Sequence, residues 1–263
     1  EFQSPAGYLY EAGGPDWAYN FGTHHSNLLR AWFYTKGTPL GKHFIEEERR
    51  FFDWVSYNVV PERGEWVLNR AVETRRSMPV VGFSYRHPLA EFVPIARAFI
   101  PTRDEVSGEI AASRKHLVET WPNVAPLAVG EFSAFSPYVF LHREQPEYLS
   151  STEEKKKAVA MLPVNARQQF NHQRMDSRSP IVFTYIRRPA YYAAFNSGKQ
   201  ITRQQRLGLG LLWSPGEGAL LQSQSNSADA AWGTRQKGAA QVFEAGSVEA
   251  TFSSGTPTAG ARD

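Results

Sequence analysis

The sequence predicts an α+β chain in which helices occupy the first half and antiparallel strands the second. Two observations carry this prediction. Apolar residues recur at helical spacing up to Pro122, and from about Ala128 they fall in short runs separated by turns. Pro122 and Pro126 end the helical pattern. We therefore expect a helical region over residues 1–125 and an antiparallel β-sandwich region over 126–263.

The composition is that of a folded protein. Hydrophobic residues make up 41% of the 263, which is too many for a disordered chain. The net charge of +3 is small and the arginines are scattered, so nucleic acid is not an expected partner. The absence of cysteine excludes disulfides, thiolate metal sites and a cysteine nucleophile. No apolar run reaches about 18 residues, so no membrane span is expected.

The stretch richest in polar and aromatic side chains runs from Tyr8 to Trp32. It begins as a short extended piece, breaks at the turn-forming cluster 13–16, and continues with apolar residues at helical spacing. Polar side chains gather where the helix should begin; they are Asp16, Tyr19, Asn20, His24 and His25. Backbone N–H groups at a helix start can also face an anion, which favours a functional site at this junction. Each residue also has a structural interpretation, as a core aromatic, a helix cap or a buried hydrogen-bond partner.

Further helices are expected over residues 44–55, 89–100 and 102–121. The first of these follows a break at 36–41 and should form an αα-hairpin with the preceding helix. The last should begin with a capping box, Thr102-Arg103-Asp104-Glu105.

A second polar cluster lies between these helices. Its members are Asn69, Arg70, Glu73, Arg75, Arg76, Tyr85, Arg86 and His87. Guanidinium groups beside aromatic rings suit a ligand that carries carboxylate or sulfate, because the two N–H groups match two oxygens. The alternative interpretation is a solvated surface laced with salt bridges.

Strands are expected in the second half over residues 138–142, 181–186, 190–195, 206–213 and 218–222. Turn residues at 196–198 and 214–216 should separate the later strands. The charged run 153–157 predicts a solvated helix or loop face, and the residues from 253 onward predict a flexible tail.

The segment Glu11-Ala12-Gly13-Gly14-Pro15-Asp16-Trp17-Ala18-Tyr19, followed by a helical and then a β region, resembles the heparinase II/III-like polysaccharide lyases. The resemblance implies helical hairpins from the end of an incomplete α/α toroid, followed by an antiparallel β-sandwich. It places the family's catalytic tyrosine at Tyr19. The family's neutralising Asn-His pair precedes this segment, so Asn20 with His24 or His25 would have to substitute for it. The resemblance covers roughly the first quarter of the chain.

The resemblance implies β-elimination on a uronate-containing polysaccharide by a secreted or periplasmic enzyme, of which this chain is the C-terminal portion. The expected partners are an anionic polysaccharide and the missing N-terminal helices of the same protein. Under this hypothesis Tyr19, Asn20, His24 and His25 are catalytic. The residues expected to contact substrate are Glu11, Asp16, Trp17, Arg70, Glu73, Arg75, Arg76 and His87. No cofactor is expected, although a structural divalent cation stays open.

Two other functions stay open. A glycoside hydrolase needs two carboxyl groups about 5–5.5 Å or about 6.5–9.5 Å apart, for which Glu11, Asp16 and Glu73 are candidates. A non-catalytic carbohydrate-binding or structural piece is the third. A catalytic metal site is not expected, because adjacent histidines 24 and 25 cannot face one ion from one helix and no HExxH spacing occurs. Only the fold could bring the spaced histidines 142 and 172 together.

Overall fold

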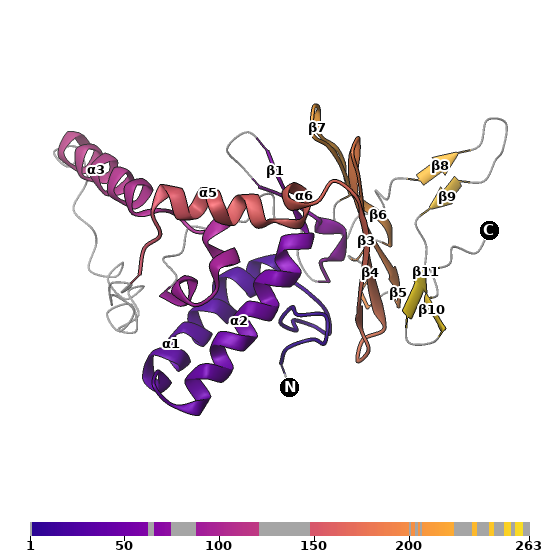
Figure 1. Cartoon of the computed structure of the whole chain (residues 1–263), viewed down its shortest axis with the longest axis horizontal. Helices are drawn as coiled ribbons and strands as arrows, with labels where there is room; N and C mark the ends of the chain where they lie inside the picture. The colour runs from indigo at the N-terminus through magenta and orange to yellow at the C-terminus, as the bar shows by residue number, and fades with distance from the viewer. Residues whose placement is uncertain are drawn as a thin grey trace. The chain divides into compact units, whose positions relative to one another are not determined.

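The computed structural model describes residues 2–62, 66–74, 88–120, 148–199, 201–202, 205, 207–223, 233–235, 242–244, 250–253 and 256–259. The chain divides into two compact units, Glu1–Gly82 with Val159–Asp263, and Phe83–Ala158. Helices and antiparallel sheets are both present, which confirms the α+β class (Figure 1). The expected boundary at residue 125 lies outside the described residues.

The first unit contains the expected αα-hairpin (Figure 1). A π-helix, η1 (Tyr19–His24), leads directly into α1 (His25–Thr35), and α2 follows over Pro39–Tyr57. The start of α2 is capped by Thr38, whose side chain accepts a hydrogen bond from the backbone N–H of Gly41 at 3.4 Å. Pro39 occupies the first helical position, where its missing N–H costs nothing.

Short elements that the sequence did not predict follow α2. Strands β1 (Val59–Pro61) and β2 (Trp66–Leu68) form an antiparallel pair, and a 3₁₀-helix, η2, spans Arg70–Val72. Later in the chain, the short helix α6 (Pro163–Ala166) precedes the main sheet.

The main sheet is a five-stranded antiparallel meander in chain order (Figure 1). Its strands are β3 (Phe170–Asp176), β4 (Ile181–Arg188), β5 (Tyr191–Gly198), β6 (Gly208–Ser214) and β7 (Gly218–Gln222). The strand predictions within β4 to β7 are confirmed, and so is the turn between β6 and β7. The turn expected at 196–198 is wrong, because these residues pair with β4 as far as Gly198. Strand β3 was not predicted.

Helix α2 packs against one face of this sheet. The ring centroids of Trp54 and Phe183 lie 5.8 Å apart, and those of Tyr57 and Tyr185 lie 5.2 Å apart. Trp54, Phe183 and Tyr185 are fully buried. Each such side chain contributes about 1.5–3 kcal/mol by leaving water, so this contact is a principal source of the unit's stability.

Two short hairpins occupy the C-terminal residues. Strands β8 (Gly233–Arg235) and β9 (Val242–Glu244) form one, and β10 (Ala250–Ser253) and β11 (Thr256–Ala259) form the other. The flexible tail expected from residue 253 is therefore wrong for β11. Thr256 and Thr258 suit a strand, whereas Pro257 and Ala259 do not, so the pairing with β10 rather than the local sequence determines this strand. The described residues form one five-stranded sheet and three two-stranded sheets, so a sandwich stays a prediction.

The second unit begins with two 3₁₀-helices, η3 (Pro88–Glu91) and η4 (Pro94–Ala98), followed by α3 (Arg103–Thr120). The single helix expected over 89–100 is wrong, because Pro94 forces the preceding residue out of the helical region.

The capping box at the start of α3 is confirmed. The Thr102 backbone N–H donates to the Glu105 carboxylate at 2.6 Å, and the Glu105 N–H donates to the Thr102 hydroxyl at 3.2 Å. Helix α5 (Thr152–Met161) starts in the second unit and contains the solvated charged run expected at 153–157. Lys155 of α5 pairs with Glu105 at 2.8 Å, which holds the two helix starts together.

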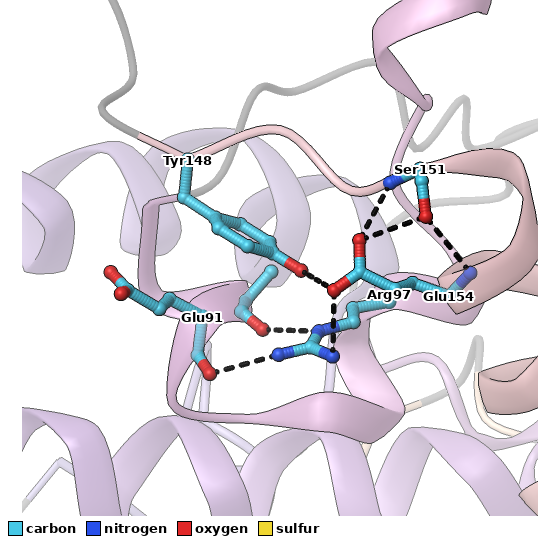
Figure 2. A network of polar contacts seen from close by, with 6 residues as sticks. Glu91, Arg97, Tyr148, Ser151 and Glu154 are labelled. Carbon is cyan, nitrogen blue, oxygen red and sulfur yellow. Dashed lines mark hydrogen bonds and ion pairs between the residues drawn. The ribbon is translucent and has the colours of Figure 1, made fainter.

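A carboxylate network organises the start of α5 (Figure 2). The Glu154 side chain accepts hydrogen bonds from the Ser151 backbone N–H at 2.8 Å and hydroxyl at 3.0 Å, and from the Tyr148 hydroxyl at 2.9 Å. Arg97 lies 3.3 Å from the same carboxylate, stacks over the Tyr148 ring and donates to the Glu91 carbonyl at 3.0 Å. The network thus joins η3 and η4 to the start of α5.

We expect this network to make the second unit less stable in acid. Hydrogen bonds from Ser151 and Tyr148 hold the pKa of Glu154 below its ordinary value of 4.5. Because the folded pKa is lowered, the stabilisation is complete above the unfolded value and is lost as pH falls through the folded one. An NMR titration of the Glu154 carboxyl group should give a midpoint below 4.5. A midpoint at or above that value would contradict the proposed hydrogen bonding, and Glu154→Gln should reduce the acid sensitivity of thermal unfolding.

Candidate functional site

The helix at the junction begins at a buried aspartate. The Asp16 carboxylate accepts a hydrogen bond from the Tyr19 backbone N–H at 2.9 Å, and its carbonyl accepts one from Asn20 N–H at 2.9 Å. These contacts are those of an N-cap residue, and a carboxylate is also favoured by the positive end of the helix dipole. Asp16 is fully buried, so its carboxylate has a structural role at the helix start.

Trp17 and Asn20 are also buried. The Trp17 ring stacks on Phe21, with ring centroids 5.7 Å apart, and its indole N–H donates to the Asn69 carbonyl at 3.1 Å. The Asn20 amide both donates to and accepts from the backbone of Leu9, each at 2.9 Å. Both side chains thus stabilise the backbone conformation of the junction. Their predicted roles in substrate binding and catalysis stay predictions.

The π-helix η1 changes which side chains share a side of the helix. In an α-helix, residues five apart lie about 140° from each other around the axis. The i→i+5 hydrogen bonds of a π-helix instead widen the turn, which brings residue i+5 closer to the side of residue i. Tyr19 and His24, the first and last residues of η1, are five apart, and both are half-buried rather than buried. The helix therefore presents a phenol and an imidazole on one side.

Glu11 lies beside His24. Its carboxylate is 3.5 Å from His24 Nε2, and the two side chains are 20% and 27% exposed. A tight turn presents Glu11, with backbone hydrogen bonds of 2.7 and 3.2 Å to Gly14 and a positive φ of 51° at Ala12. We refer to Glu11, Tyr19 and His24 as the junction site. These three are the predicted site residues near the start of η1 whose side chains are described and partly accessible.

The second polar cluster meets the junction through η2 and the residues after it. Thr74 donates from its backbone N–H to the Pro15 carbonyl at 2.9 Å and from its hydroxyl to the Glu11 carbonyl at 3.0 Å. Arg70 and Glu73 lie 3.6 Å apart with side chains 4% and 1% exposed. A buried ion pair is costly to break, so the interpretation as a solvated surface is wrong for these two residues.

Several candidates fall outside this description. Arg75, Arg76, Tyr85, Arg86 and His87 lie outside the described residues, and so does the side chain of His25.

Sequence reasoning missed Asp176, which holds the loop that carries Glu11. Its buried carboxylate accepts hydrogen bonds from the Tyr8 hydroxyl, from the Tyr10 hydroxyl at 2.7 Å and from the backbone N–H of Arg178 at 2.9 Å. Burial, together with the hydrogen bond to Asp176, raises the pKa of Tyr10 to about 12. The run Asp-Ser-Arg-Ser at 176–179 could have pointed to Asp176, because an Asp side chain commonly accepts hydrogen bonds from the N–H groups that follow it in a turn.

No metal cluster is found among the described residues: no three His, Asp or Glu side chains there are grouped to hold an ion. His172 stacks on Tyr57 with centroids 4.3 Å apart and accepts a hydrogen bond from Arg174 Nε at 3.2 Å. Burial lowers the pKa of His172. His142 lies outside the described residues. Of the helices that the structure describes, none combines the length and apolarity needed to cross a membrane.

No protein-family model, curated protein or solved structure matches the chain. The resemblance to heparinase II/III-like lyases therefore rests on the segment 11–19 and the order of the helical and β regions, and it stays a hypothesis.

The capping role of Asp16 predicts different results for two substitutions. Asp16→Ala removes the acceptor for the Tyr19 N–H and should lower the free energy of unfolding by about 0.5–2 kcal/mol. Asp16→Asn keeps a cap of similar preference and should lose clearly less. Urea denaturation of the three proteins measures both values. Equal losses for the two variants would show that the negative charge, rather than the hydrogen bond, stabilises this helix start.

Proposed function

We propose that the chain is part of a polysaccharide lyase that cleaves a uronate-containing polysaccharide by β-elimination. The observation that carries the proposal is the junction site, where a π-helix presents Tyr19 and His24 on one side and Glu11 lies 3.5 Å from His24. π-Helical turns are rare and frequent at functional sites, which adds support.

In β-elimination a base removes the proton from the carbon next to the uronate carboxylate. The electron pair forms a carbon–carbon double bond, and the glycosidic oxygen leaves and takes up a proton. Tyr19 is the proposed base and acid: as the phenolate it takes the first proton, and the phenol so formed gives that proton to the leaving glycosidic oxygen. The negative charge that develops on the carboxylate must be stabilised by a donor held in place beforehand.

His24 is the proposed donor to that carboxylate. An imidazole N–H can donate a hydrogen bond to the carboxylate, and Glu11, 3.5 Å from His24 Nε2, is placed to orient the ring. Asn20, the other expected neutraliser, has both ends of its amide engaged by Leu9, so His24 receives more support. In this proposal Arg70, which is paired with the buried Glu73, has a structural role near the site.

The finer fold predictions belong to the same proposal. The hairpin α1–α2 would be the last hairpin of an incomplete α/α toroid, and the five-stranded sheet one layer of a sandwich. The remaining helices would come from an N-terminal part of the same secreted or periplasmic protein.

The glycoside hydrolase alternative receives less support. It needs two carboxyl groups that face a sugar. Of its three candidates, Asp16 and Glu73 are fully buried, and Asp16 caps the helix. Glu11 alone is partly accessible. A non-catalytic sugar-binding piece stays the third candidate and predicts binding that survives substitution of Tyr19.

Tyr19→Phe should abolish most of the activity in the complete protein. The change keeps the ring and deletes the hydroxyl, so a catalytic phenol should lose about 10²–10⁴-fold in kcat with the fold intact. A structural tyrosine should instead lose about 0.5–1.5 kcal/mol of stability and little turnover. The assay uses anionic polysaccharides and follows the ultraviolet absorbance of the unsaturated uronate product.

Tyr34→Phe is the matched control, because Tyr34 lies on α1 and is 75% exposed. It should leave both turnover and stability unchanged. Unchanged turnover in Tyr19→Phe would exclude Tyr19 as the acid or base. Release of reducing ends without new absorbance, abolished by Glu11→Gln, would favour a hydrolase.

A further inference from the structure

The face of the main sheet turned away from α2 carries an arginine, Arg188, that has no acidic partner among the described residues. Tyr185 of β4 faces α2, so alternation along the strand places Arg188 on the opposite face. Arg188 pairs in register with Tyr191 of β5, which puts the two side chains next to each other. Asn171 of β3 lies on the same face and accepts a hydrogen bond from Arg188 Nη2 at 2.9 Å.

The Arg188 guanidinium is anchored but not saturated. Nη1 donates to the carbonyl oxygens of Phe170 at 3.0 Å and Arg187 at 2.7 Å, and Nη2 donates to Asn171. These bonds use three of the five N–H donors of an arginine. The Nε–H and one Nη2–H remain available. No carboxylate lies within ion-pair distance of Arg188 in the part of the chain that the structure describes.

The surroundings favour an anion. Residues 159–223 contain eight Lys and Arg but only two acidic residues, Asp176 and Glu217. Two adjacent donors on one guanidinium match the two oxygens of a carboxylate.

An aromatic ring completes the arrangement. Tyr191 is 37% exposed beside Arg188 and can receive the apolar face of a sugar ring. At the other end of the same face Val182 and Ser197 are buried, so exposure is concentrated at the end that holds Arg188 and Tyr191.

We propose that Arg188, Tyr191 and Asn171 form a second binding site, for a uronate-bearing oligosaccharide. A ligand carboxylate accepts hydrogen bonds from the two remaining N–H groups of Arg188, and a sugar ring lies against Tyr191. The choice of a uronate rests on the proposed function, whereas the preference for an anion rests on the arginine itself. The site would hold the polysaccharide away from the junction site.

Calorimetry with the Tyr19→Phe protein tests binding without consuming the ligand. The probes are oligogalacturonate, which carries carboxylates, dextran sulfate oligosaccharides, which carry sulfates, and neutral dextran oligosaccharides. Arg188→Gln should raise the Kd for oligogalacturonate about tenfold to a hundredfold, as expected for loss of a charged hydrogen-bonded contact. Lys199→Gln, which makes the same charge change at the far end of β5, should change it less than about twofold.

Asn171→Ala is the second variant, because Asn171 is exposed and its loss frees the guanidinium without removing the charge. It should weaken binding less than Arg188→Gln does. NMR of the Arg188 Nε–H should also show a shift on titration with oligogalacturonate. Equal effects of Arg188→Gln and Lys199→Gln, or equal binding of neutral dextran, would overturn the proposal. Selective binding of dextran sulfate would overturn the carboxylate assignment.

The two proposals fail separately. If the unsubstituted protein forms no unsaturated product but still binds in an Arg188-dependent way, the lyase proposal is wrong and the second binding site is supported. Product formation together with Arg188-independent binding would do the reverse. A change in oligomeric state on Arg188→Gln, measured by size-exclusion chromatography with light scattering, would instead identify this face as a contact between copies.

Discussion

The first unit depends on the packing around one indole. The Trp54 ring lies 5.3 Å from Tyr8, 4.9 Å from Trp17 and 5.8 Å from Phe183, measured between centroids, and it is fully buried. These partners belong to the N-terminal loop, the junction and the sheet. One side chain of α2 therefore ties together segments that are far apart in the sequence. Loss of a buried aromatic of this size costs about 3–5 kcal/mol, which is a large share of the stability of an ordinary domain.

Several polar groups of this core are hydrogen-bonded to one another or to the backbone, and these hydrogen bonds position the junction site. Asn58 donates to Tyr185 at 2.7 Å and accepts from Asn69 at 3.1 Å, while Asn69 receives the indole N–H of Trp17. Asp176 performs the same task for the loop that carries Glu11. Because a buried polar group without a partner costs several kcal/mol, each of these contacts fixes the path of the chain around it.

Local patterns predicted the elements whose signals lie within a few residues. The capping box at Thr102 identified a helix start because capping is a local interaction. The short run of β-branched and aromatic residues at 181–186 identified β4 in the same way. The start of α2 was placed too late, because Thr38 and Pro39, which cap and begin this helix, were interpreted as part of a break. The prediction failed where distant contacts decide: β3, with its half-buried polar side chains, is a strand because β4 pairs with it. The π-helix could not be predicted from the sequence either, because its sequence fits an α-helix equally well.

The candidate site shows the same division. The sequence pointed to Glu11, Asp16, Asn20 and His24 because polar residues are dense there. It could not distinguish the residues with a structural role from those that are accessible to a ligand. Burial separates them: Asp16 and Asn20 serve the backbone, while Glu11 and His24 stay partly exposed. The two sets depend on each other, because a side chain can act on a ligand with defined geometry only when its neighbours are fixed. The buried polar residues of the junction are thus the support on which any chemistry of Tyr19 and His24 would rest.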